Sequence, residues 1–204
     1  MTLEKILTNF LESYMQSCFF AMPAIVIGVK SEEELRVDVQ PLVNRVFKDG
    51  TEQEYPTLLS VPCIMPHTNT SALTMPVNQG DTVMLLFSQR SIEQFKLGAT
   101  DPHTPNSTRW MDVNDAVALV GFSPFTKSPN LKRNHNLPHN PKDMVLTHNL
   151  GKSNECELRL TESGRIEINA PQGLFVNGLP YAGHTHSYTD DGTPLVTSPP
   201  IGQT

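Results

Sequence analysis

The stretch ELRLTESGRIEINAPQGLFVNGLP, residues 157–180, can be written as three rows of eight residues. Each row has apolar residues at its second and fourth positions, and polar, Gly or Pro residues follow them. Because alternate residues of a strand face the same side of a sheet, each row predicts a short strand with one apolar face, and the next row repeats the unit. The residues of this predicted apolar face, the shaft core, are Leu158, Leu160, Ile166, Ile168, Leu174 and Val176.

A row of eight residues is too small to bury its own apolar face, which leaves two arrangements open. In the first, the rows of one chain form an ordinary antiparallel meander packed on the preceding domain. In the second, three chains wind around one axis and turn their apolar pairs inward as a dry triangular prism, which also hides the strand edges. The second arrangement predicts a homotrimer with a β-helical shaft over residues 149–182.

Two histidines, His184 and His186, follow the rows at a spacing that lets both imidazoles of a strand point to one side. Two ligands are too few for structural zinc, which takes four. Around a threefold axis the pair would supply six nitrogens, an octahedral set that suits iron, nickel or cobalt better than zinc. For a trimer, the sequence therefore predicts an apex with a shared metal ion over residues 183–204.

Five short β-branched or alternating runs precede the rows, separated by Gly, Pro, Asn and Asp, and they predict strands. Five strands in about a hundred residues suit a small closed barrel or sandwich, and an OB-fold barrel has that strand count. We assign this predicted domain to residues 23–125. The runs are AIVIGVK (24–30), ELRVDVQPLV (34–43), TLLSVPCIM (57–65), DTVMLLFSQ (81–89) and DAVALVGF (115–122).

Residues 1–22 predict an amphipathic helix, because their apolar residues recur at steps of three and four. Thr2 is a suitable N-cap, and Pro23 a suitable stop. The apolar face predicts either a helix packed on its own domain, which we favour, or a helix that docks onto a neighbouring subunit or protein.

Residues 126–148 form a predicted linker, rich in Pro and Asn and without periodicity. The linker contains His135 and His139, whose spacing would bring them together on a helix. Pro138 and Pro141 argue against such a helix, so the sequence does not favour a metal site there.

Composition excludes several classes of function for the 204 residues. The net charge is -6, and the longest Lys/Arg run is a single pair, which argues against binding to nucleic acid. No apolar run approaches the roughly 20 residues of a membrane span, and the N-terminal residues lack the layout of a secretory signal, so synthesis in a cytoplasm is expected. The three cysteines are too widely spaced for a disulfide framework.

Catalytic motifs are missing from the sequence. It has no G-x-S-x-G elbow, phosphate-binding glycine loop or EF-hand, so a non-enzymatic protein is expected. A metal-dependent hydrolase that uses His184, His186 and a third ligand is the least favoured alternative.

Three barrel segments and two C-terminal segments resemble one known family. The segments LSVP (59–62), TMPVNQGDTVMLLFSQRSI (74–92) and DAVALVGF (115–122) resemble the N-terminal OB domain of the central spike proteins of contractile-tailed bacteriophages. GHTH (183–186) and TSPP (197–200) resemble the iron-binding apex of the same family. The fold expected from pattern and resemblance together is mainly β: an N-terminal helix, an OB-fold barrel and a short trimeric β-prism with a pointed, metal-bound tip.

The resemblance implies a homotrimer at the tip of the tail baseplate of a virion, assembled in the host cytoplasm. Its barrels would attach to a baseplate hub protein, and six histidines, His184 and His186 of each chain, would hold one iron ion per trimer. Sheath contraction would drive the spike into the host outer membrane. The competing hypothesis is a baseplate hub or adaptor module with a trimerisation stem and no metal.

Overall fold

A computed structural model describes residues 2–181, 187–190 and 193–196. The chain divides into two compact units, Met1–Ser123 and Pro124–Thr204, and each is described by itself. Within the described residues, no helix has the length and apolar character that crossing a bilayer requires.

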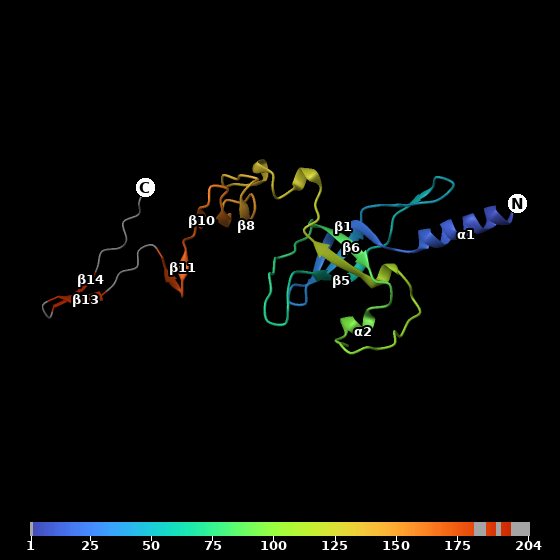
Figure 1. The fold of residues 1–204 in the computed structure, drawn as a ribbon, viewed down its shortest axis with the longest axis horizontal. Coiled ribbons are helices and arrows are strands. Elements are labelled where there is room, and N and C mark those ends of the chain that lie inside the picture. Colours follow the sequence, from blue (N-terminus) through green and yellow to red (C-terminus); the bar gives the residue numbers. More distant parts are fainter. Residues whose placement is uncertain (1, 182–186, 191–192, 197–204) are drawn as a thin grey trace. The chain divides into compact units, whose positions relative to one another are not determined.

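The first unit is built on a closed five-stranded barrel with the strand order β1-β2-β5-β7-β6 (Figure 1). Every neighbouring pair is antiparallel except β5 and β7, which run parallel. The prediction of a mainly β fold with a small closed barrel after an N-terminal helix is confirmed. The barrel strands are β1 (Ala21–Ser31), β2 (Arg36–Pro41), β5 (Leu58–Ile64), β6 (Thr82–Phe87) and β7 (Ala116–Val120).

In the barrel strands, alternating side chains point into the barrel interior and fill it. In β2 every second residue is buried, and in β6 Val83 and Leu85 are fully buried while their neighbours are not. This is the period of two that a strand imposes on its side chains. The core consists of Ala24, Val26, Val37, Val39, Leu58, Val61, Val83, Leu85, Ala116 and Ala118.

Helix α1 (Leu3–Ser17) precedes the barrel, and none of its residues is buried. Thr2 caps it as predicted, accepting a hydrogen bond from the amide of Lys5. Its contacts with the barrel unit include Lys48, which bonds Asn9 and pairs with Glu12 at 2.9 Å. Lys48 follows β3 (Arg45–Val46), which pairs with β4 (Glu52–Gln53). The expectation that the apolar face of α1 packs on its own domain is wrong for the described residues, because that face is exposed.

A long connection between β6 and β7 contains α2 (Glu93–Lys96) and a 3₁₀ helix, η1 (Val113–Asp115). Asp115 is 1% exposed and anchors this connection to the barrel. Its carboxylate accepts hydrogen bonds from the Arg109 guanidinium and from the amide of Ile92.

The second unit contains an antiparallel three-stranded sheet in the order β10-β9-β8. Residues 124–143 precede the sheet and include the short 3₁₀ helices η2 (Phe125–Lys127) and η3 (Lys132–Asn134). The strands are β8 (Met144–His148), β9 (Cys156–Leu160) and β10 (Ile166–Asn169), followed by the pairs β11 (Phe175–Val176) with β12 (Leu179–Pro180) and β13 (Ser187–Asp190) with β14 (Thr193–Val196).

Candidate functional site

One face of the β8–β10 sheet carries two cross-strand rows of apolar side chains. Leu160 of β9 lies opposite Met144 of β8 and Ile166 of β10. In the same way, Leu158 lies opposite Leu146 of β8 and Ile168 of β10. We call the six residues the apolar face: Met144, Leu146, Leu158, Leu160, Ile166 and Ile168.

The apolar face is exposed in the single chain. Its outer side chains Met144 and Ile166 are 74% and 72% exposed, and even Leu158 on the central strand is 39% exposed. Contiguous exposed apolar surface of this kind marks an interaction site in proteins that stay in solution. A surface that binds another chain is therefore the first candidate function of the sheet.

The opposite face of the same sheet is charged and buried. Glu157 and Arg159 of β9 are 4% and 7% exposed, and Arg159 Nη2 lies 2.6 Å from Glu157 Oε1. Arg159 also donates to the carbonyl oxygen of Pro138, and Asn169 of β10 donates to Glu157 Oε1 at 2.7 Å. This sheet is therefore reversed relative to an ordinary half-buried sheet, whose polar side faces water.

Residues 124–143, the covering segment, provide the partners that keep these charges out of water. Asp143 of this segment lies 3.8 Å from Arg159 Nη1, and its carboxylate accepts a hydrogen bond from the amide of Glu162. Because the covering segment occupies the charged side, a further chain would contact the sheet on its apolar face.

A buried histidine lies under the same part of the sheet. The His135 side chain is 2% exposed; its Nδ1 lies 2.9 Å from Glu155 Oε1, and its Nε2 lies 2.6 Å from the carbonyl oxygen of Pro129. The ring of His139 stacks on His135 with centroids 3.8 Å apart. No helix spans the two histidines, as expected from Pro138 and Pro141, yet the folded segment still brings both rings together.

Two pKa shifts describe this environment. Burial and the neighbouring His135 lower the pKa of His139 below its ordinary value, so its ring is neutral at physiological pH. Burial by itself would raise the pKa of Glu155, but hydrogen bonds from the amides of Asn136 and Gly151, together with the neighbouring His135, outweigh it and lower that pKa. Glu155 is therefore a buried carboxylate in its charged form.

The structure brings together four of the six predicted shaft-core residues. Leu158 and Leu160 on the central strand and Ile166 and Ile168 on the edge strand β10 are four of the six residues of the apolar face, paired antiparallel within one chain. Leu174 is half-buried just before β11, and Val176 of β11 is 51% exposed. β11 pairs with β12 in a separate two-stranded sheet, so neither residue is part of the apolar face.

Two residues of the apolar face were missed by the eight-residue pattern. Met144 and Leu146 lie on β8, within the stretch predicted as a linker. The alternation in MVLTH was the available signal, but the Pro and Asn residues before it hid so short a run.

The predicted metal ligands His184 and His186 lie outside the described residues. Nothing in the described fold therefore tests the apex, and it remains a prediction.

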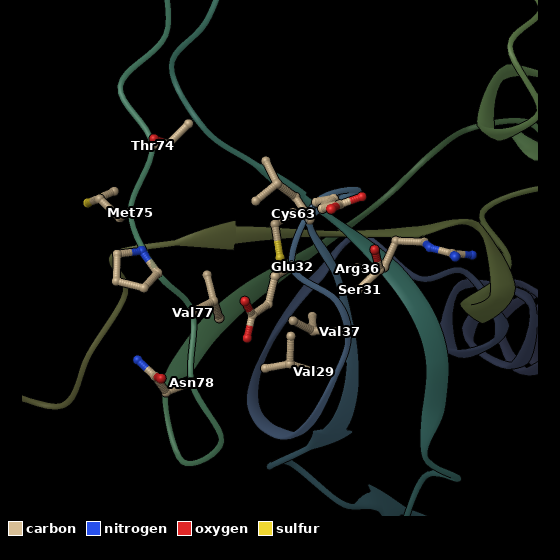
Figure 2. Close-up of a pocket in the computed structure, with 13 residues that line it drawn as sticks. Val29, Ser31, Glu32, Arg36, Val37, Cys63, Thr74, Met75, Val77 and Asn78 are labelled. Atoms are coloured by element: carbon tan, nitrogen blue, oxygen red, sulfur yellow. The ribbon is translucent and has the colours of Figure 1, made fainter.

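The barrel has a pocket of about 420 Å³ between the β1–β2 connection and residues 74–78 (Figure 2). Its lining includes Glu32, Arg36 and Cys63, with apolar side chains such as Val77. Burial raises the pKa of the Cys63 thiol, so at neutral pH the group is protonated and a weak nucleophile. The pocket can accommodate a small apolar group, but its thiol is not activated.

The barrel residues are similar to a known protein family. Residues 22–121 match the family described as the phage protein Gp138 N-terminal domain. The match begins one residue into β1 and ends just after β7, so it covers the barrel and neither α1 nor the second unit. No curated protein matches the chain. The family match indicates a phage baseplate-related protein.

Proposed function

We propose that the chain is the central spike of a contractile phage tail, a structural protein that pierces the host outer membrane when the sheath contracts. A structural role in a phage tail or baseplate is what the family match suggests. The observation that carries the finer proposal is the reversed sheet, with the exposed apolar face on one side and buried charges on the other.

The apolar face requires a partner, and a second and third copy of the same chain fit it best. In a prism of three chains, each apolar face meets the other two around one axis, so the six side chains leave water together. Complete burial of one fully exposed side chain of this kind contributes roughly 1.5–3 kcal/mol, so burying the exposed parts of all six is comparable with the stability of an ordinary domain. A closed prism also leaves no free strand edge, which suits a part that transmits force.

The C-terminal histidines complete the proposal at the tip. His184 and His186 of three chains would hold one iron ion with six nitrogens. A metal bound where the apolar core runs out would tie the chain ends together, because its binding free energy adds to the free energy of folding. The support is the sequence spacing and the resemblance of residues 183–186 and 197–200 to the spike apex.

The proposed partners follow from this architecture. The barrels would attach to the baseplate hub protein, and the tip would face the host outer membrane, so the protein would be located at the tail tip of the virion. The acidic balance of the chain does not favour nucleic acid as a partner. The protein is proposed to act mechanically and not as an enzyme.

Sedimentation equilibrium of the purified full chain tests the proposal. The expected mass is about three times the 22.6 kDa of one chain. Gold-labelled antibody against the chain should bind intact particles only at the tip of the tail. A chain that stays monomeric at micromolar concentration, or label elsewhere on the particle, would refute the spike.

A second candidate, a hub or adaptor module, is favoured by α1. Its exposed apolar side chains, Phe10 among them at 65%, form a second unpartnered surface that another baseplate protein could cover. Iron content separates the two candidates, because an adaptor with only a trimerisation stem should contain no stoichiometric iron.

A further inference from the structure

We propose that His135, Glu155 and Glu157 hold a divalent metal ion under the charged face of the sheet. This site lies within a single chain and is separate from the predicted apex. One nitrogen of His135 and one carboxylate oxygen from each glutamate all lie within 4.8 Å of one another. All three side chains are almost completely buried, at 2% exposure or less.

The hydrogen bonds of His135 prepare its ring for a metal. Its Nε2 faces the carbonyl oxygen of Pro129, which can only accept, so Nε2 carries a proton. Metal-binding histidines commonly donate their second N–H to a backbone carbonyl in this way. Nδ1 then faces Glu155 Oε1 at 2.9 Å, and two acceptors at that distance need a proton or a metal ion between them.

The separation of 2.9 Å is that of a hydrogen bond. Two ligand atoms about 2.0–2.1 Å from one tetrahedral ion lie about 3.3 Å apart, so a bound ion would move these two atoms slightly away from each other. The argument for a metal therefore rests on the third group.

A proton on His135 would satisfy Glu155, but it would leave one buried oxygen of Glu157 without a partner. Its Oε1 accepts hydrogen bonds from Arg159 and Asn169, but its Oε2 is buried and has no hydrogen-bond partner within the described part of the chain. Leaving a buried charged oxygen unpaired is costly, and native proteins rarely do so. A metal ion shared with Glu155 and His135 would satisfy it.

Charge balance under the sheet supports the same conclusion. Asp143 and Glu157 lie beside the Arg159 guanidinium, whereas Glu155 lies beside His135. Among these contacts of the described residues, three carboxylates therefore have one fixed positive charge, which leaves two negative charges uncompensated. A divalent ion beside a neutral imidazole neutralises them, whereas a proton on His135 neutralises only one. One imidazole and two carboxylates are three of the four ligands that Zn²⁺ takes, as in zinc sites whose fourth position is held by water, and Zn²⁺ is the ion we infer.

The backbone around the site is built to hold Glu155. The amides of Gly151 and Asn136 both donate to its Oε2, at 2.8 and 2.6 Å. Gly151 has φ +72°, and a Cβ there would lie 2.7 Å from the carbonyl oxygen of Asn134, so the loop admits only glycine without rearrangement. The proposed ion would join the covering segment, through His135, to β9 and its preceding loop.

Metal stoichiometry of the full chain tests this site independently of the apex. The double variant His184→Ala/His186→Ala removes the proposed apex ligands, and the protein is then dialysed against Zn²⁺ and afterwards against metal-free buffer. We expect one zinc per chain, whereas an apex ion would contribute one third per chain. Adding Glu157→Gln should lower zinc at least tenfold, while Glu162→Gln, which changes an exposed carboxylate in the turn between β9 and β10, should leave it unchanged.

Two outcomes overturn the proposal. One is zinc below a tenth of an equivalent in the His184→Ala/His186→Ala protein, and the other is equal zinc in the Glu157→Gln and Glu162→Gln proteins. Nitrogen-15 NMR of labelled histidine in the same protein needs no variant at the site. We expect a neutral His135 ring whose Nδ1 resonance shifts when Zn²⁺ is added. A doubly protonated ring whose resonances do not change on Zn²⁺ addition would contradict a metal site.

Discussion

At the scale of single residues, Asp115 shows how the barrel accommodates a buried charge. Its carboxylate receives Arg109 Nε at 3.1 Å, Arg109 Nη2 at 3.3 Å and the amide of Ile92 at 3.1 Å. The hydrogen bonds with Asp115 raise the pKa of Arg109, so the guanidinium stays charged at every physiological pH. A buried carboxylate persists only with such partners, and here they anchor the connection between β6 and β7.

Replacing Asp115 by alanine should destabilise the barrel by about 1–3 kcal/mol, because buried donors then lose their acceptor. Urea unfolding followed by the fluorescence of Trp110 measures this, since it is the one Trp of the sequence and lies in the barrel unit. Asp101→Ala, at an exposed position of the same connection, is the control. Equal midpoints for the two variants would show that the Asp115 network contributes nothing.

At the scale of elements, the β8–β10 sheet and α1 each present an apolar surface with no cover in the described chain. The two surfaces differ in how the other sides of their elements are covered. The sheet has one side closed by the covering segment, so only the apolar face remains available. The helix has polar residues on its remaining sides, and it contributes no buried residue to the barrel unit.

Ile168→Asp should prevent assembly of the trimer, because a carboxylate in a dry prism would have to lose its hydration without a partner. Sedimentation velocity of the full chain should show conversion from trimer to monomer, with the barrel still folded by Trp110 fluorescence. Ser163→Asp, in the exposed turn between β9 and β10, adds the same charge away from the apolar face. A trimeric Ile168→Asp protein would place the subunit contact elsewhere.

Deleting residues 2–17 should leave the stability of the barrel within about 0.5 kcal/mol of the full chain, the range of surface changes. The reason is that α1 buries none of its residues. The urea midpoint reported by Trp110 fluorescence is the measurement, and the full chain is its reference. A loss well above 1 kcal/mol would mean that the helix packs on its own barrel after all.

At the scale of the whole molecule, the proposed assembly joins three features: barrels for attachment, a prism closed by apolar faces, and a metal-bound tip. The prism would hold the three chains in register and bring their C-terminal segments near one axis. Only that arrangement lets two histidines per chain make a six-ligand site.

The apex predicts that iron per chain falls by one third of an equivalent when His184 and His186 are both replaced by alanine. Elemental analysis of the purified oligomer measures the loss. The sedimentation coefficient should remain that of a trimer if the apolar faces provide most of the contact. An unchanged iron content would exclude the histidine pair as ligands.

Local patterns in the sequence predicted much of the fold. The five barrel strands and the strands at residues 157–160 and 166–168 were predictable because alternation and turn residues act over a few positions. The helix and its Thr2 cap were predictable for the same reason. The strand β8 was not, since its five residues follow a Pro- and Asn-rich stretch and gain their stability from pairing with β9.

Local periodicity was enough to predict most of the strands, β8 excepted, and the side chains that share a face of them. Which face is covered depends on the tertiary fold. It placed the charged side of β9 under residues 124–143 and brought His135 against Glu155, twenty positions along the chain. Contacts between distant segments depend on how the whole unit closes, and no local period encodes them. The apolar pattern of residues 157–168 thus predicted a buried face, while the fold of one chain leaves that face open to a partner.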